Sequence, residues 1–514
     1  MKKILATILA LVMALALTAT VWADGDGTAS GSMTGADFLA KAKNGAITLA
    51  DDVTLSTSCS ISDGQTYTIN LNGHTLSADN TTIMLRHGKL IVNGTGTIKE
   101  NAPNFGAIMI KGSVNNADTN YSVVEVNAGV ILEGWSPIFV DQNAKKAYGV
   151  SVTVNGATLN ARKDTAGASG TGVYVNGQIA DENNAPVISL TNTKICDVDN
   201  ASQGMYLAGY ATTTLTNCDI TGVTGVEIRA GKLTVSGGAI TGTATPVTVT
   251  PDGNGSTTVG AGIALAQHTT KLPVIVTIEN ATVKGYTGVY ESNPQKNDAD
   301  SIAKVNLTIS GGNFEAINNG TNAVHSEDCT NFISGGTFSS AVDTTYLADT
   351  VNYKVSGTNS VSYFTNLNDA VAAAGADDEV KNLKETPAHA GSTVTLKDGE
   401  TVITTLHTEA ATVDLPTLTK TGYTFKGWKD EDGKVYNGKL TISEENGGEL
   451  VVREAVTLTA VWSANSYYYY PSTSTTDSTT GKASPKTFDA GIGVYAGMAL
   501  ASLTGLAYTG KKKF

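Results

Sequence analysis

The chain has little charge, few aromatic residues and few cysteines for its length. Charged residues make up 16% and aromatic residues 6% of its 514 residues, whereas a typical soluble domain is about 25% charged. Four cysteines over this length exclude a small scaffold held together by disulfides. Acidic residues outnumber basic ones by 47 to 34, so the chain lacks the basic surface that general nucleic-acid binding requires.

Glycine, by contrast, is abundant. The 55 glycines exceed the roughly 7% of an average protein, and threonine, asparagine and valine are also frequent. This composition favours a β-rich architecture with many turns over a helical bundle. A chain of this length is expected to fold into roughly two to four domains.

The N-terminus predicts export. Lys2 and Lys3 precede an apolar run over residues 4–21, and Val21-Trp22-Ala23 supplies tolerated residues before a cleavage point. A positive start, a hydrophobic segment and a small residue at the cleavage point define a secretory signal peptide. We therefore expect residues 1–23 to be removed during secretion. The alternative is a buried N-terminal helix.

Three features follow one another at the C-terminus. Residues 464–483 are rich in Tyr, Ser and Thr without apolar periodicity, which predicts a disordered spacer. After a short motif, residues 490–510 carry no charge and would span about 31 Å as a helix, which matches a bilayer core. Three lysines follow this transmembrane span and are expected to stay on the cytoplasmic side. We therefore predict a sorting segment at residues 484–514.

The order of motif, apolar span and basic tail resembles the sorting signal of Gram-positive sortase substrates. The motif is Ser484-Pro485-Lys486-Thr487-Phe488. It is similar to the S/N-P-X-T variants of the LPXTG type and departs from the commonest pattern at its first and last positions. The resemblance implies that a sortase cleaves after Thr487 and joins the protein to peptidoglycan. The alternative is a simple C-terminal membrane anchor, which would also place the protein on the cell surface.

An eight-residue motif recurs through the middle of the chain at intervals of 20 to 43 residues. It reads apolar, any, apolar, small polar, Gly/Asn/Ala, any, any, apolar. Its fifth position is occupied in order by Gly73, Gly94, Ala128, Gly156, Asn192, Asn217, Gly237, Asn280, Gly311 and Gly335. Self-similarity of this kind is typical of repeat architectures.

A second motif lies between these copies and consists of Gly or Pro followed by apolar, any, apolar. Its copies include Gly172-Val173-Tyr174-Val175, Gly204-Met205-Tyr206-Leu207, Gly225-Val226-Glu227-Ile228 and Pro246-Val247-Thr248-Val249. Each repeat therefore holds at least two short strands joined by bends, where Asn and Gly tolerate left-handed backbone angles. Stacked coils bury the apolar faces of such strands. We predict an all-β fold with a parallel β-helix of about ten coils at residues 24–341; a β-sandwich is the alternative.

The repeat region resembles right-handed parallel β-helix proteins of the pectate-lyase-like class. Many of these are polysaccharide lyases or hydrolases, which need acidic Ca²⁺ ligands with a base, or paired carboxylates. No such cluster recurs on neighbouring coils, so we predict no catalytic residues. Glu227 and Arg229 are the best single candidates. Both are expected to point outward and to form a surface ion pair rather than a site.

The middle position of the second motif predicts a row of outward side chains on successive coils. In order, these are Met109, Phe139, Tyr174, Tyr206, Glu227, Thr248, Tyr290 and His325. The faces of exposed aromatic rings can pack on sugar rings or on a protein partner. The candidate ligand-binding residues are therefore Tyr174, Tyr206, Glu227 and Tyr290. The alternative is ordinary stacking between neighbouring strands.

Two further patterns are interpreted as structural. Asn72, Asn93, Asn127 and Asn155 occupy an equivalent bend and predict a hydrogen-bonded ladder. The four cysteines have no metal-binding spacing and are expected to be small apolar fillers. We expect neither a metal nor a cofactor.

The composition changes after the repeats. We expect an α/β connector at residues 342–389, with a short helix at 367–375 that ends at its glycine. Residues 390–463 alternate again and contain the strings GYTFKGW, beginning at Gly422, and TAVW, ending at Trp462. These strings resemble the Listeria–Bacteroides repeat, which implies a small β-grasp-like stalk or adhesion module without known catalysis. The residues expected to form its core are Tyr423, Phe425, Trp428 and Trp462.

Together these features predict a wall-anchored surface protein of a Gram-positive bacterium. Its expected function is non-catalytic adhesion, through the β-helix, to glycans or to proteins of a host or a neighbouring cell. Sortase and peptidoglycan are the expected partners of the C-terminus. The alternative function is a surface-attached polysaccharide lyase or glycoside hydrolase, and a third interpretation is a spacer that projects no specific surface.

Overall fold

A computed structural model describes residues 25–142, 144–253 and 255–465. The structure is all-β, with 51% of residues in strands and 5% in helices, as the sequence predicts. No helix in the described ranges is long and apolar enough to cross a membrane. The predicted signal peptide, the sorting motif and the apolar span at 490–510 lie outside the described residues.

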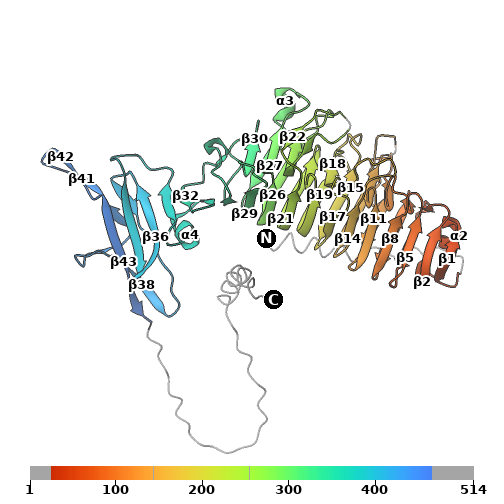
Figure 1. The fold of residues 1–514 in the computed structure, drawn as a ribbon, viewed down its shortest axis with the longest axis horizontal. Helices are drawn as coiled ribbons and strands as arrows, with labels where there is room; N and C mark the ends of the chain where they lie inside the picture. Colours follow the sequence, from red (N-terminus) through yellow and green to blue (C-terminus); the bar gives the residue numbers. More distant parts are fainter. Residues whose placement is uncertain (1–24, 143, 254, 466–514) are drawn as a thin grey trace, which may run out of the picture. The chain divides into compact units, whose positions relative to one another are not determined.

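The chain winds in coils that each contain three strands. One coil consists of β7 (Gly88–Asn93), β8 (Gly96–Glu100) and β9 (Ile108–Lys111). These strands pair in parallel with the equivalent strands of the next coil, which are β10 (Ser122–Val126), β11 (Val130–Gly134) and β12 (Ile138–Asp141). Figure 1 shows one of the resulting rows of strands, from β5 through β8, β11, β14 and β17. The long parallel sheets are consistent with the predicted parallel β-helix.

Three rows of parallel strands run through the coils. The first row comprises β4 (Thr66–Asn70), β7, β10, β13 (Val150–Asn155), β16 (Val187–Thr191), β25 (Val274–Glu279) and β28 (Val305–Ile309). The second row comprises β5 (Thr75–Ala78), β8, β11, β14 (Thr158–Ala161), β17 (Lys194–Asp197), β26 (Ala281–Gly285), β29 (Gly312–Ala316) and β31 (Gly336–Phe338). Long strands that contribute to both rows are β1 (Thr28–Met33), β2 (Ala46–Leu55), β19 (Thr212–Gly222) and β21 (Gly231–Gly242).

The third row is a separate sheet of ten strands, which agrees with the number of coils predicted. It comprises β3 (Cys59–Ile61), β6 (Ile83–Leu85), β9, β12, β15 (Thr171–Val175), β18 (Gln203–Leu207), β20 (Val226–Ile228), β24 (Ala261–Ala266), β27 (Thr287–Ser292) and β30 (Val324–Ser326). The helical turns α2 (Gly35–Ala40), α3 (Ala299–Ile302) and η1 (Thr344–Tyr346) lie in connections between strands.

Residues with left-handed backbone angles turn the chain between the first and second rows. Asn192, Asn217 and Asn280 have φ angles of 48°, 51° and 54°, and Gly156 has a φ angle of 69°. All four occupy the fifth position of the recurring motif. Because glycine and asparagine adopt these angles most readily, the motif repeats wherever a coil needs this bend.

The predicted asparagine ladder is present in part: it joins Asn70, Asn93 and Asn127, and two of its four predicted members, Asn72 and Asn155, lie outside it. Asn93 donates from Nδ2 to Oδ1 of Asn70 over 3.3 Å, and Asn127 donates to Oδ1 of Asn93 over 2.7 Å. Asn72 lies outside the ladder because the paired strands align Asn70 with Asn93. Asn155 makes no side-chain hydrogen bond to the described residues.

Aliphatic side chains fill the inside of the coils. In β16, Ile188 and Leu190 are fully buried, whereas Ser189 between them faces outward and is half-buried. One continuous core extends from Ala29 to Tyr363, as expected for stacked coils. All four cysteines are free thiols, and three of them belong to this core, as expected of apolar fillers.

One predicted coil strand is wrong. The sequence predicts a coil strand around Thr248, but β24 occupies that place, and its Ala264 pairs with both Glu227 and Tyr290. Thr248 instead belongs to β22 (Thr248–Val249), which forms an antiparallel pair with β23 (Thr258–Val259). Residues 243–253 and 255–260 therefore belong to an insertion between two coils, and we refer to them as the insertion loop.

Residues 353–464 form a mixed sheet with its own core. Its strands are β32 (Tyr353–Ser356), β33 (Val361–Phe364), β34 (Glu379–Asn382), β35 (Ser392–Asp398), β36 (Thr401–Thr408), β38 (Tyr423–Lys429), β39 (Val435–Tyr436) and β43 (Ala455–Ala464). Two small hairpin sheets pair β37 (Thr412–Asp414) with β40 (Lys439–Thr441) and β41 (Ser443–Asn446) with β42 (Glu449–Val452). The strands of the expected connector and those of the expected module thus share one sheet.

Helix α4 (Leu367–Ala373) coincides with the predicted short helix. The aromatic string packs largely as predicted: Trp428 is fully buried and donates from Nε1 to the carbonyl of Pro416 over 2.7 Å. Phe425 and Trp462 are half-buried against the same core. Tyr423 is 46% exposed, so the prediction that it belongs to the core is wrong.

Leu190→Ala should lower the free energy of unfolding by about 2–5 kcal/mol, because the change leaves a cavity in the shared core. Ser189→Ala on the same strand removes an outward side chain and should change it by about 0.5 kcal/mol or less. Urea denaturation followed by circular dichroism measures both variants. An equal loss in the two variants would contradict the inward orientation of Leu190.

Candidate functional site

Three aromatic rings of the predicted row stack on successive coils. Phe139 pairs with Tyr174, and Tyr174 pairs with Tyr206, on β12, β15 and β18. The ring centroids are 4.6 Å apart at an angle of 12° in the first pair and 5.4 Å apart at 24° in the second. Both faces of Tyr174 are therefore covered by other rings. A ligand can reach its edge, but the row is not the open platform of ring faces that the sequence suggested.

A groove of about 470 Å³ lies along these ring edges, a size typical of small-molecule sites. Its aromatic side is formed by Trp135, Tyr174 and Tyr206. The Trp135 ring stands at 86° to the Tyr174 ring with 5.9 Å between centroids, and its Nε1 donates to the carbonyl of Ser169 over 2.8 Å. Trp135 and Tyr174 are thus held in place before any ligand binds.

The remaining lining of the groove is uncharged and mixes polar residues with small apolar ones such as Ala201 and Val223. It includes the side chains of Ser169, Thr171, Asn200, Gln203 and Ser256. Gly255, Ser256 and Val259 come from the insertion loop, which therefore forms one wall. The residues that line the groove include no Asp, Glu, Lys, Arg or His.

Glu227 fixes the insertion loop from beneath. The sequence predicts this side chain at the surface, but the loop covers it completely, so the prediction is wrong. Its Oε1 accepts hydrogen bonds from the Thr257 N–H (2.8 Å), the Thr257 hydroxyl (2.7 Å) and the Thr258 N–H (3.3 Å). Its Oε2 accepts from Nε2 of Gln203 over 3.1 Å. Glu227 therefore positions the wall and the floor of the groove without lining it.

Arg229 is the second buried anchor of the insertion loop. Its guanidinium donates to the carbonyls of Asp252 (2.8 Å) and Gly255 and to the hydroxyl oxygen of Tyr206 (3.1 Å). Arg229 and Glu227 each bind the loop rather than each other, so the predicted surface ion pair is also wrong. The reason is the insertion loop, which replaces water over the outward side of β20.

Burial alters the protonation of the groups around the groove. It raises the pKa of the Glu227 carboxyl, although the hydrogen bonds from Thr257 act in the opposite direction. It also raises the pKa values of the Tyr174 and Tyr206 phenols, which therefore stay neutral. The pKa of His268 is lowered to about 4 by burial and by the nearby charge of Arg229. The tyrosine hydroxyls of the groove are thus protonated near neutral pH and supply no phenolate base.

Tyr290 lies apart from the groove. Its ring stacks on His325 of the next coil, with 4.7 Å between centroids. In the row of outward side chains, Ala264 separates it from Glu227. Of the four predicted ligand-binding residues, two line the groove, Glu227 lies buried behind it and Tyr290 does not contribute.

The sequence analysis missed Trp135, Thr171 and Gln203. The last two had a recognisable signal, because a polar residue directly precedes the glycine of the second motif in Thr171-Gly172, Gln203-Gly204, Thr224-Gly225 and Thr287-Gly288. The glycine is required by close approach of the coils: a Cβ atom on Gly172 would lie 2.5 Å from the carbonyl oxygen of Gly204. The repeated pair therefore marks the start of a strand where neighbouring coils approach closely, with a polar side chain beside the glycine.

One group elsewhere could ligate a cation. The carboxylates of Asp51 and Asp52 and the imidazole of His74 place ligand atoms within 4.8 Å of one another. Both aspartate side chains are largely exposed, at 79% and 70%, so water competes for any ion. Oδ1 of Asp52 already accepts the N–H of Thr75 over 2.8 Å.

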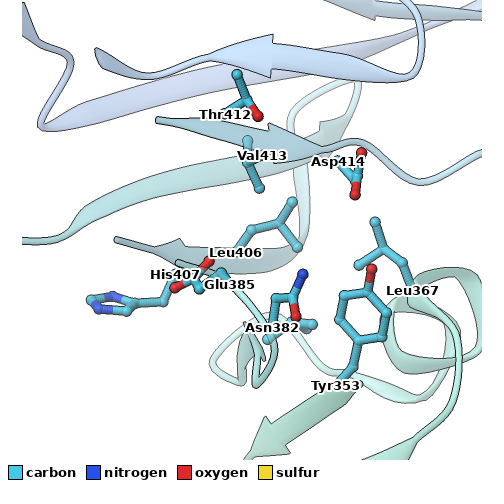
Figure 2. A pocket seen from close by; sticks show the side chains of 10 residues that line it. Tyr353, Leu367, Asn382, Glu385, Leu406, His407, Thr412, Val413 and Asp414 are labelled. Carbon is cyan, nitrogen blue, oxygen red and sulfur yellow. The ribbon is translucent and has the colours of Figure 1, made fainter. Parts of the chain in front are cut away.

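A small cavity lies in the mixed sheet of residues 353–464. Its volume is about 40 Å³, which suits a water molecule rather than a ligand. Figure 2 shows Tyr353, Leu367 and Asp414 around it, while the imidazole of His407 extends away from the other labelled side chains. The groove beside Tyr174 is therefore the better candidate site.

Comparison with known proteins identifies no relative, since no family model, no curated protein and no solved structure matches the chain.

Glu227→Gln should change how the stability of the protein depends on pH. Burial raises the pKa of Glu227 in the folded state, so the folded protein retains a proton that the unfolded chain releases above about pH 4. The free energy of unfolding of the wild type, relative to that of the variant, should therefore rise as the pH falls from about 7 to about 4 and then level off. Urea unfolding across this pH range measures the difference. A difference that shrinks in acid would contradict the raised pKa.

Proposed function

We propose that this protein is an exported, wall-anchored binding protein of a Gram-positive bacterium. In this proposal a right-handed parallel β-helix displays the ligand groove, and a β-grasp-like module and a spacer connect it to the cell wall. The observation that carries the binding function is the groove of about 470 Å³ between the insertion loop and the edges of Tyr174 and Tyr206.

The chemistry of the groove supports binding rather than catalysis. Hydrolysis or lyase chemistry on a polysaccharide needs carboxylates or a base that face the substrate. Glu227 is fully buried, and both of its oxygens already accept hydrogen bonds from the protein. The groove itself is lined by aromatic rings, hydroxyls, amides and small aliphatic side chains, which hold a ligand without supplying an acid–base pair.

The fixed wall also supports binding. Glu227 and Arg229 hold the insertion loop through hydrogen bonds at both its Asp252 and its Thr258 side. The groove is therefore shaped before a ligand arrives, and little conformational entropy is lost on binding.

The 25–464 fragment, which retains every residue of both cores, should bind a ligand on an array of glycans and extracellular-matrix proteins. Tyr174→Ala should weaken this binding about tenfold or more, because it removes one side of the groove. The matched control is Tyr121→Ala, since Tyr121 is also half-buried and stacked, on His87 with 4.3 Å between centroids, but does not line the groove. Array binding that is unchanged by Tyr174→Ala would overturn the proposal. Release of reducing ends from a polysaccharide would favour the lyase or hydrolase instead.

Thr487→Ala should move the protein from the cell-wall fraction to the membrane fraction or the medium, because the resemblance places the sortase cleavage after Thr487. Thr479→Ala in the spacer is the matched control and should leave the protein in the wall fraction. Cell fractionation with immunodetection measures both variants. Retention of Thr487→Ala in the wall fraction would count against covalent anchoring.

A further inference from the structure

Two polar groups in the groove have no hydrogen-bond partner in the described part of the chain. Thr171 and Gln203 are paired on the neighbouring strands β15 and β18, and each residue is only 6% exposed. Neither Oγ1 of Thr171 nor Oε1 of Gln203 makes a hydrogen bond to a described residue, although both residues line the groove. Neither atom is among the fully enclosed polar atoms that lack a partner, so both are open to the groove, where a ligand can replace the water that bonds to them.

The orientation of the Gln203 amide is fixed by Glu227. The carboxylate accepts a hydrogen bond from Nε2 of Gln203 over 3.1 Å. Because this hydrogen bond uses the amide nitrogen as its donor, the amide oxygen of Gln203 is left for a ligand. The groove therefore presents an acceptor at Gln203 and a hydroxyl, which both donates and accepts, at Thr171.

We infer that the groove binds an uncharged sugar residue, one of whose hydroxyls donates to Oε1 of Gln203 while a second pairs with Oγ1 of Thr171. This inference rests on the proposed binding function and narrows it to one class of ligand. A sugar ring combines neighbouring hydroxyls, which match the two adjacent polar groups, with C–H surface, which packs on Trp135 and on the edges of the tyrosine rings. An apolar side chain of a protein partner would leave both polar groups unpaired.

The charge of the site excludes acidic sugars. No Lys, Arg or His side chain lines the groove, so the carboxylate of a uronic acid would lose its water without gaining a counter-charge. The guanidinium of Arg229 is fully buried and is already bonded to Asp252, Gly255 and Tyr206. A neutral hexose leaves no charge unpaired in the groove.

Calorimetric titration of the 25–464 fragment tests this inference. The neutral probes are maltotetraose, cellotetraose and mannotetraose, and the acidic probe is tetragalacturonate. At least one neutral probe should bind at least about tenfold more tightly than the acidic one. Thr171→Val keeps the shape of the side chain, removes only the hydroxyl and should weaken this binding about tenfold. Thr153→Val, at an exposed threonine of β13 outside the groove, is the matched control and should leave it unchanged.

The outcomes separate this inference from the proposed function. The inference would be overturned if tetragalacturonate bound more tightly than every neutral probe. It would also be overturned if Thr171→Val left the affinity for the neutral probe unchanged. Binding of an array protein but of no saccharide, still weakened by Tyr174→Ala, would overturn the inference and leave the binding function in place. The absence of any binding that depends on Tyr174 would overturn both. Because Thr171 makes no hydrogen bond within the described protein, unchanged urea unfolding of Thr171→Val confirms that a loss of affinity is not a loss of folding.

Discussion

Parallel pairing in register is the constraint on which the rest of the structure depends. It places equivalent residues of successive coils at the spacing of neighbouring strands, about 4.8 Å, although they are far apart in sequence. The core, the asparagine ladder and the aromatic stack all follow from it. The environment of a residue in this fold therefore depends on the residues that pair with it on the two neighbouring coils. Glu227, for example, lies between Tyr206 and Ala264.

The position of Glu227 between Tyr206 and Ala264 explains where the groove forms. The row of outward side chains is aromatic from Phe139 to Tyr206, where large rings fill the space between coils. At Glu227 and Ala264 the row changes to an acid and a small residue, and both are fully buried. The small side chain leaves room above β24, and the acid supplies acceptors for the backbone N–H groups of Thr257 and Thr258. The insertion loop packs over this interruption of the row, and the groove forms where the loop meets the last rings of the stack.

The sequence predicted the parts of this arrangement that repeat. Alternation and the bend at Asn or Gly identify the coil strands, which is why Phe139, Tyr174 and Tyr206 were aligned correctly. The alignment failed at Thr248 because two segments fit the same pattern. The strand pairing distinguishes the two: β24 pairs in parallel with β20 and β27, whereas Thr248 belongs to an antiparallel pair inside the insertion loop. Periodicity also predicted correctly that Glu227 leaves the core, but it carries no information about a loop that covers the outside.

The same stacking determines which parts of the site can recognise a ligand. Rings that stack from coil to coil use their faces on one another, so a regular aromatic row contributes stability and an apolar edge but little specificity. The residues that discriminate between ligands are then expected at positions where the regular pattern is interrupted. Thr171 and Gln203 lie at such positions, directly before the glycines that allow the close approach of neighbouring coils. Both residues precede the apolar-any-apolar part of the second motif, which is why an analysis based on that alternation passed over them. In a fold built by repetition, a site is therefore expected beside the row that the repeat defines, at the bends and insertions that interrupt it.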